Sequence, residues 1–225
     1  MASRPVFIPT RSKTSFVREI PIEFRWHAGM SVSQKQKSIA SLHTAIHDQR
    51  GVAKILEISS KSMIPLGVRL SAFNLMMTIN DRNLSVEVVY QASKRFERGG
   101  PYSDILNMSS RDAKTDSRLR ESGPLLGFSL DGDPWPLEPT TAFYDWLYLH
   151  ALRANPVLAD ELLEYGALTD IEFNLEKSLN CQARSGALYI ALVKDGLLQQ
   201  ALLNRKNYFE IIGGGSAENA QKGLF

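Results

Sequence analysis

The stretch Ser85-Val86-Glu87-Val88-Val89-Tyr90-Gln91-Ala92-Ser93-Lys94 decides the fold of this chain, together with Leu70-Ser71-Ala72-Phe73-Asn74 upstream. Serine is a residue that caps helices, so Ser85 can begin one. Glu87 would then lie in the first turn, where the helix dipole favours a carboxylate. The stretch therefore predicts a helix from Val86 to about Glu97, ended by the glycines and the proline that follow.

Four polar side chains recur on this predicted helix at three- and four-residue spacing. Glu87, Tyr90, Gln91 and Lys94 would therefore share one face. A carboxylate, a phenol, an amide and an amine on one face indicate a small polar pocket. Each alone also has an ordinary role, because Glu87 can satisfy the dipole, Tyr90 can pack with a wet tip, and Lys94 can be solvated. The pocket hypothesis depends on the four acting together.

The composition indicates a soluble globular protein without a strong global field. The chain has 225 residues, of which 44% are hydrophobic and 22% charged, and its net charge is +2. Any nucleic-acid contact must therefore depend on local patches. The single cysteine, Cys181, excludes an internal disulfide and makes the cytoplasm the default location. We see neither a secretion signal nor an apolar run of membrane-spanning length.

The pattern along the chain predicts more helices than strands, by about two to one. The expected strands or extended stretches are Val6 to Phe24, Ala53 to Ile58, Gly67 to Leu75, Gly127 to Trp135 as a hairpin, and Leu168 to Phe173. The further expected helices are Ser33 to Gln49 capped by Ser33, one within Ser109 to Glu121, one from Thr141 with a restart at Asn155-Pro156, and Gln182 to Leu203 bent near Gly196. A turn is expected at Asn80 to Asn83.

This order lacks regular strand–helix–strand alternation and internal repeats. It predicts an α+β fold, a helix-rich single domain with a small β-sheet, over residues 1–212. Residues 213–225 open with Gly-Gly-Gly-Ser and are expected to be a flexible tail or an expression remnant.

Lys61 follows a predicted buried strand and stands among Ser59, Ser60 and Ser62. An amine held near apolar walls has a lowered pKa and can act as a nucleophile. A plain loop lysine is the other interpretation, and it is the more common one.

Two further segments carry candidate ligand-binding groups. Asp170 and Glu172 alternate on the last predicted strand, so both would face a pocket or both would face solvent. Asn180, Gln182 and Arg184 open the last long helix, where backbone donors and these side chains could hold a pyrophosphate. The alternative there is a capped helix start with a surface arginine.

The histidines show no metal-ligand spacing, and the chain lacks a P-loop, a G-x-G-x-x-G and a G-x-S-x-G motif. No metal and no cofactor are therefore expected. Cys181 is expected to pack rather than react.

The two quoted segments resemble elements of the NADAR (YbiA-like) superfamily. Leu70 to Asn74 is similar to its L/F-S-N-F-Y element, and Ser85 to Lys94 to its S/T-V-E-H-Y-Y/F-Q-A-x-K element. Val88 stands where that family has histidine, and the family's Trp-Gly near the C-terminal strand is missing. Roles fixed by those two positions cannot be carried over.

The chain also resembles one subgroup, the NADAR antitoxins encoded beside DarT-type DNA ADP-ribosyltransferases. The similar segments are Glu57 to Ser62, Trp135 to Tyr148 and Asn180 to Ser185. The resemblance implies an N-glycosidase that removes ADP-ribose from guanine bases in DNA and so reverses the toxin. ADP-ribosylated DNA would be the substrate, ADP-ribose the product, and a DarT-type toxin a possible direct partner, with no membrane involved.

With that activity, Glu87 is the expected acid/base, and Lys61, slightly ahead of Lys94, the amine that stabilises the transition state or traps the opened ribose. The expected substrate-binding residues are Ser71, Phe73, Asn74, Tyr90, Gln91, Trp146, Asp170, Glu172, Asn180, Gln182 and Arg184, with Phe73, Tyr144 or Trp146 stacking on a base. Two alternatives remain open. One is a NADAR-fold N-glycosidase acting on a small ribosylated metabolite, and the other is a non-catalytic antitoxin that binds the toxin.

Overall fold

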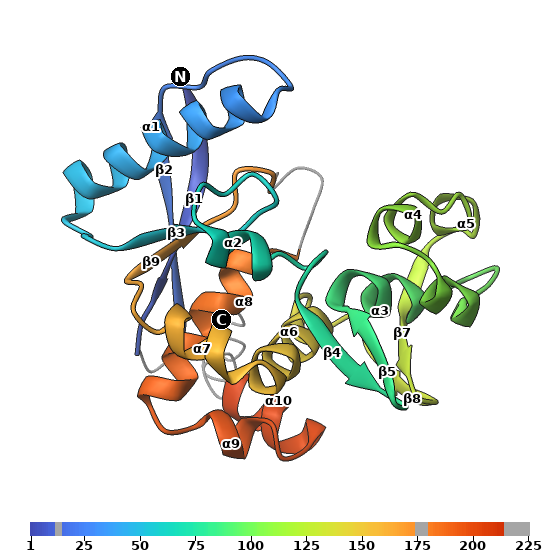
Figure 1. Cartoon of the computed structure of the whole chain (residues 1–225). Coiled ribbons are helices and arrows are strands. Elements are labelled where there is room, and N and C mark those ends of the chain that lie inside the picture. Colours follow the sequence, from blue (N-terminus) through green and yellow to red (C-terminus); the bar gives the residue numbers. More distant parts are fainter. Residues whose placement is uncertain (12–14, 174–179, 214–225) are drawn as a thin grey trace, which may run out of the picture.

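The two N-terminal strands form a hairpin at one edge of a mixed four-stranded sheet (Figure 1). The computed structural model describes residues 1–11, 15–173 and 180–213. In spatial order the strands are β2 (Val17–Phe24), β1 (Ala2–Pro9), β9 (Ala167–Thr169) and β3 (Ile55–Glu57). β9 pairs antiparallel with β1 and parallel with β3. The extended stretch and the strand before Ile58 are thus confirmed.

Helices cover both faces of this sheet, because successive strand residues point to opposite sides. Val6 packs with the buried face of α1 (Val32–Arg50), whereas Phe7 packs with α8 (Gln182–Lys194). The buried face of α1 consists of Ile39, Leu42 and Ile46, as predicted. Its cap is Ser31, whose hydroxyl accepts the Gln34 N–H at 3.3 Å, and not Ser33.

A group of C-terminal helices packs against α8 and completes the main core (Figure 1). These helices are α6 (Ala142–Ala154), α7 (Pro156–Leu162), α9 (Leu198–Ala201) and α10 (Arg205–Gly213), the last of which the sequence did not predict. Asn155 lies between α6 and α7, and its amide donates to the carbonyls of Met76 and Ala151. The predicted helix restart is confirmed, and Asn155 also fixes the neighbouring hairpin to this core.

The remaining elements form the right-hand part of Figure 1. They are the hairpin β4 (Met76–Ile79) and β5 (Arg82–Ser85), the sheet β6 (Lys94–Phe96), β7 (Leu125–Leu130) and β8 (Asp133–Trp135), the helix α3 (Val86–Ala92), the 3-10 helix η1 (Ser103–Asn107), and the short helices α4 (Ser110–Thr115) and α5 (Arg118–Glu121). The predicted hairpin before Trp135 and the turn near Asn80 are both present. The class is α+β, as predicted.

The strand predicted from Gly67 to Leu75 is wrong. The helix α2 (Pro65–Arg69) and a turn occupy this stretch. Pro65 stands at the first helical position, where its fixed φ favours a helix. Leu66 and Leu70 are four residues apart and both are buried. This spacing is typical of a helix rather than of the predicted strand.

The helix containing Glu87 is shorter than predicted, since it ends at Ala92. Lys94 pairs with Phe128 of β7 as a strand residue, so sheet pairing replaces the last helical turn. The polar stretch after Ser109 forms two helices rather than one, and β9 ends at Thr169, before Asp170. The described residues hold nine strands and ten α-helices, so the expected two-to-one excess of helices is wrong.

None of the helices in the described part of the chain has the length and apolarity needed to cross a membrane.

Gly67 is a position where only glycine fits, and it offers a stability test. A Cβ there would collide with the Glu57 carbonyl oxygen and lie 2.5 Å from the Ser62 hydroxyl. We expect Gly67→Ala to lower the free energy of unfolding by about 1–3 kcal/mol, because backbone must move to accept the methyl group. Urea unfolding measures the change. Gly213→Ala is the control, since its Cβ would meet no atom within 4 Å. Equal midpoints for both variants would contradict the close contact at Gly67.

Candidate active site

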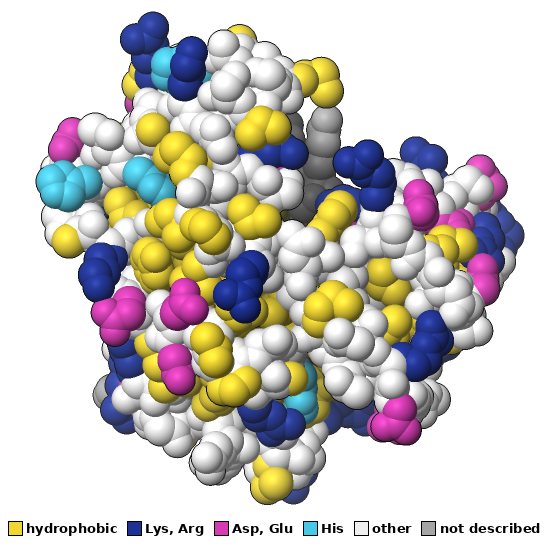
Figure 2. Space-filling model, viewed as in Figure 1, with side chains coloured by type: hydrophobic (Ala, Val, Ile, Leu, Met, Phe, Trp, Pro, Cys, Tyr) yellow, Lys and Arg dark blue, Asp and Glu magenta, His cyan; other side chains and the backbone are white. Residues whose placement is uncertain are grey.

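A cleft of about 660 Å³ lies between the end of the four-stranded sheet and the part of the chain that contains α3, α4 and α5. Loops from the sheet side, α3, β6 and both short helices all contribute side chains to it. Figure 2 shows Lys and Arg side chains on both sides of this hollow. The cleft is therefore polar and carries positive charge at its edge.

Most of the predicted site residues meet in this cleft. Those that line it are Lys61, Ser71, Phe73, Glu87, Tyr90, Gln91, Lys94, Asp170, Glu172, Asn180 and Gln182. Tyr144, one of the three aromatic candidates for stacking, lines it too.

Glu87 and Gln91 form the buried floor that α3 contributes. Ser85 caps this helix by accepting the Val88 N–H at 3.3 Å, and the Glu87 N–H donates to the Ala72 carbonyl at 2.9 Å. The Gln91 amide nitrogen donates to Glu87 Oε1 at 2.8 Å. The Gln91 oxygen is buried and finds no partner among the described residues. This oxygen can therefore accept a hydrogen bond from a donor group of a ligand.

Tyr90 is held between the two walls of the cleft. The Asn180 amide donates to its hydroxyl at 2.6 Å, and the Tyr144 ring meets it edge-on at 5.2 Å. Burial, and then the charge of Glu87, raise the pKa of Tyr90. Its phenol stays neutral and keeps a proton that it can donate.

Lys94 lies over the face of the Tyr90 ring, with Nζ 4.8 Å from the ring centroid. Burial lowers the pKa of Lys94 to about 8; the Glu87 carboxylate opposes this shift and the charge of Lys114 adds to it. A sizeable fraction of this amine is therefore neutral at physiological pH, as a nucleophile requires.

A pair of buried carboxylates stands on the opposite wall. Asp170 lines the cleft, and Glu57 lies behind it at the end of β3. Burial raises the pKa of both groups, and the charge of Glu57 raises the pKa of Asp170 further. Glu57 accepts the Ile171 N–H at 2.8 Å and the Thr169 hydroxyl at 2.6 Å. Desolvation thus favours one proton on this pair of acids.

His43 of α1 extends this polar chain away from the cleft. Its Nε2 lies 2.9 Å from the Thr169 hydroxyl oxygen, and that hydroxyl donates to Glu57. Burial lowers the pKa of His43 to about 4, so the ring is neutral and Nε2 must carry the donated hydrogen.

Gln182 lines the cleft, but both the oxygen and the nitrogen of its side-chain amide form hydrogen bonds with the backbone. Its oxygen accepts the Ala72 N–H and its nitrogen donates to the Ile58 carbonyl, both at 2.7 Å. This side chain therefore joins three segments of the cleft wall. A direct pyrophosphate contact would have to break one of these bonds.

Three predicted residues are not part of the cleft lining. Arg184 points to α6, where it pairs with the buried Asp145 at 2.5 Å and donates to Thr141. Trp146 packs with Trp135, His150 and Tyr208. Asn74 is exposed, and its amide donates to Val68 and Ser71. Helical period alone cannot tell which side of α6 or α8 faces the cleft, and Asn74 lies in the turn after α2, so the sequence could not separate these residues from those that line the cleft.

Sequence reasoning missed several lining residues. Arg111, Lys114, Leu119 and Arg120 line the cleft from α4 and α5. Lys114 lies 5.1 Å from the centroid of the Phe73 ring. The signal available in the sequence was the recurrence of Arg and Lys residues between Ser109 and Glu121. The single helix predicted there gave no reason to expect these side chains at the cleft.

A family model described as DarT1-associated NADAR antitoxin matches residues 2–222. The chain belongs to this family. Membership in the DarT1-associated NADAR antitoxins supports an antitoxin role and a DarT-type toxin as the partner. The search of curated proteins gave no match. The two segments that carry the NADAR resemblance, the Glu87 helix and the turn from Ser71 to Phe73, both line the cleft.

The lowered pKa of Lys94 predicts an unusual pH dependence of labelling. With an acylating reagent in limiting amount, its modification in the folded protein should rise with pH to a midpoint near 8, against 10.5 for the unfolded chain. The same shift makes the charged amine destabilising below pH 8, and this cost should fade between pH 8 and 10.5. Mass spectrometry of the labelled peptide measures the profile. A folded-state midpoint near 10.5 would contradict the burial of this amine.

Proposed function

We propose that this NADAR antitoxin is an N-glycosidase that removes ADP-ribose from guanine bases in DNA and thereby reverses a DarT-type toxin. The observation that carries the proposal is the meeting of a buried carboxylate, Glu87, with the amine of Lys94 in a cleft lined by further cations. The cations suit a pyrophosphate, and the carboxylate with the amine suits cleavage of a glycosidic bond.

The size of the cleft supports a nucleotide-like ligand. Its volume of about 660 Å³ lies inside the range of roughly 300–1,000 Å³ typical of small-molecule sites. Lys61 and Lys114 both line the cleft, and they are the partners we propose for the two phosphates. Phe73 and Tyr144 offer aromatic surfaces for a base.

Glu87 acts as the acid and base in this proposal. The bond between ribose C1″ and the guanine nitrogen breaks while Glu87 gives a proton to the leaving nitrogen. The Gln91 amide orients the carboxyl group through the bond to Oε1, which leaves Oε2 to exchange a proton with the ligand. The neutral Tyr90 phenol and the free Gln91 oxygen supply one donor and one acceptor for ribose hydroxyls.

Lys94 supplies the nucleophile. Its neutral amine bonds to C1″ as guanine leaves, and the resulting adduct opens to an imine when the ring oxygen takes the proton from Nζ. Water then adds to C1″ and the amine departs, assisted by Asp170 or Glu172 as base. The net reaction consumes one water molecule, releases ADP-ribose and leaves unmodified guanine in the DNA strand. The sequence placed Lys61 slightly ahead of Lys94 as this amine, whereas this proposal prefers Lys94 because burial lowers its pKa.

The two other candidate functions give different outcomes in one assay. ADP-ribosylated guanine in an oligonucleotide, the free ADP-ribosylated nucleotide, and a phosphorylated ribosylamine are offered in parallel, with and without EDTA. The proposal expects ADP-ribose from the oligonucleotide with or without the chelator. Turnover of the ribosylamine alone would support the metabolite enzyme, and no turnover together with toxin capture would support the binder.

Glu87→Gln tests the acid/base role. Glutamine keeps the shape and still pairs with Gln91, but it cannot carry the proton, so we expect the rate to fall by about two to four orders of magnitude. Release of ADP-ribose in single turnover measures it, and circular dichroism checks the fold. An unchanged rate in a folded variant would leave Glu87 with only its helix-dipole role.

Reductive trapping identifies the amine. Cyanoborohydride added during turnover should link ADP-ribose to the protein, with the adduct mapping to Lys94 by peptide mass spectrometry. Lys94→Arg should lose both the adduct and turnover, because a guanidinium stays protonated. An adduct on Lys61 would move the role across the cleft, and normal turnover without any adduct would argue for direct attack by water.

A further inference from the structure

The segment of α4 and α5 presents only cations and one leucine to the cleft. Arg111, Lys114, Leu119 and Arg120 line it, whereas no acidic residue between Ser109 and Ser122 does so among the described residues. Yet this stretch contains Asp112, Asp116 and Glu121 in its sequence. Basic and acidic residues are therefore interspersed in the sequence of this segment, but only basic ones line the cleft.

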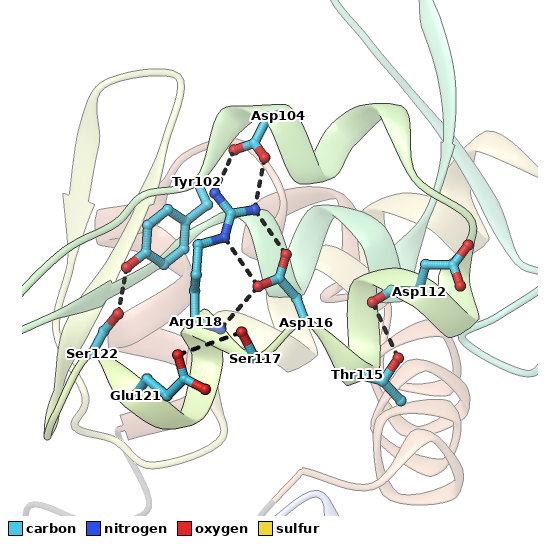
Figure 3. A network of polar contacts seen from close by, with 9 residues as sticks. All are labelled: Tyr102, Asp104, Asp112, Thr115, Asp116, Ser117, Arg118, Glu121 and Ser122. Carbon is cyan, nitrogen blue, oxygen red and sulfur yellow. Dashed lines mark hydrogen bonds and ion pairs between the residues drawn. The ribbon is translucent and has the colours of Figure 1, made fainter.

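The acids of the segment take part in polar contacts within this part of the chain, and Figure 3 shows the contacts of Asp116 and Glu121. Asp116 and Asp104 both hold Arg118, with closest nitrogen–oxygen distances of 2.7 Å. Arg118 also lies over the Tyr102 ring, 4.5 Å from its centroid. This ion-pair network fixes α5 to the 3-10 helix η1.

The other two acids, Asp112 and Glu121, form hydrogen bonds with nearby serine residues. Asp112 accepts the Ser109 hydroxyl at 2.7 Å, and Glu121 accepts the Ser117 hydroxyl at 3.5 Å. Both bonds are local to the first turns of short helices, where acids are favoured. Neither acid therefore neutralises a cation at the cleft.

Arg111 and Arg120 remain without a partner. Both side chains are exposed, and neither has an ion pair or side-chain hydrogen bond in the described part of the chain. Lys114 differs from them, because it lies over Phe73 and its charge acts on Lys94. We call Arg111 and Arg120 the cationic edge.

We propose that the cationic edge binds the phosphodiester backbone of the DNA strand that carries the modified guanine. This inference rests on the proposed function. Glu87 and Gln91 are buried at the floor, so the reacting bond must enter the cleft and the guanine must leave its stack. The phosphates next to that nucleotide then lie outside the floor, near the exposed rim where the cationic edge stands. Guanidinium groups bind phosphate oxygens through two parallel N–H donors.

The proposal predicts a loss that depends on the length of the substrate. In Arg111→Gln/Arg120→Gln, kcat/KM for a single-stranded oligonucleotide with one ADP-ribosylated guanine should fall by about tenfold at low salt. Turnover of the ADP-ribosylated guanosine monophosphate should stay within about twofold. The slope of log affinity against log salt should become shallower by about 1.4, since each phosphate contact on a single strand contributes about 0.7.

The matched control is Lys37→Gln/Arg50→Gln on α1. It also removes two exposed cations that have no ion pair or side-chain hydrogen bond among the described residues, but they lie outside the cleft lining. It should leave both the oligonucleotide rate and the salt slope unchanged. Urea unfolding of all variants checks that the fold is kept.

Fluorescence anisotropy with an unmodified labelled oligonucleotide separates this inference from the proposed activity, because it needs no turnover. If the wild type cleaves neither substrate, weaker oligonucleotide binding by the edge variant alone still supports the edge as a nucleic-acid surface. Equal losses on the oligonucleotide and the mononucleotide would overturn the proposal, as would binding and rates equal to those of the wild type. Capture of the DarT-type toxin lost in the edge variant, with DNA binding intact, would also overturn it and assign the surface to the protein partner.

Discussion

The amide of Gln182 is the constraint on which the cleft depends. Its two hydrogen bonds join the backbone at Ile58, where β3 ends, to the backbone at Ala72 in the turn before β4. Ala72 in turn accepts the N–H of Glu87 at 2.9 Å. One glutamine at the start of α8 thus fixes the loop of Lys61, the turn of Phe73 and the helix of Glu87 relative to one another. Truncating this side chain would leave buried backbone groups unpaired, which costs more than the bonds themselves contribute.

Buried polar groups in this protein concentrate around the same point. The Glu57–Asp170 pair and the Thr169–His43 contact lie on the sheet side of the cleft, and Glu87 with Gln91 on the helix side. Burying several ionisable groups lowers the stability of the fold, and such clusters are uncommon in a hydrophobic core that has no functional role. The fold supplies the compensation through backbone donors, such as the Ile171 N–H on Glu57. The arrangement is typical of a site where protonation must be controlled.

The sequence was sufficient where spacing along the chain determines spacing in space. Ser85 caps α3, and Glu87 and Gln91 meet across one helical turn, as the local pattern predicts. It failed where distant pairing decides. Lys94 leaves the helix because β6 pairs with β7, yet it stays in the cleft, since the strand carries it along the same wall. The helix of Gly67 is favoured locally by Pro65, but the close approach of its backbone to the Glu57 carbonyl is a contact that no local pattern contains.

The faces of the long helices were the other source of error. Arg184 and Gln182 are two residues apart on α8, so their side chains leave the helix in different directions. Gln182 faces the cleft, while Arg184 faces the buried Asp145 of α6. Choosing between them requires the position of α6, which only the tertiary packing provides. Asp145 then explains the arginine, because a carboxylate buried to this extent needs a charged partner.

The two walls of the cleft are held by different forces, and this difference shapes how salt should act. The sheet wall belongs to the main hydrophobic core, whereas α4 buries only Ala113 and α5 buries no residue. The α4–α5 wall joins a smaller hydrophobic cluster through Ala113, and Arg118 pairs with the partly buried Asp116 and with the exposed Asp104 of η1. Of these two ion pairs, the one with Asp104 is of the kind that salt screens. High salt therefore weakens the Arg118–Asp104 pair and the attraction of Arg111 and Arg120 for phosphate, while the hydrophobic contacts of this wall persist. A polyanion bound to this wall would place negative charge beside Arg111 and Arg120, which have no carboxylate partner among the described residues. A ligand of that kind therefore suits this positive surface best.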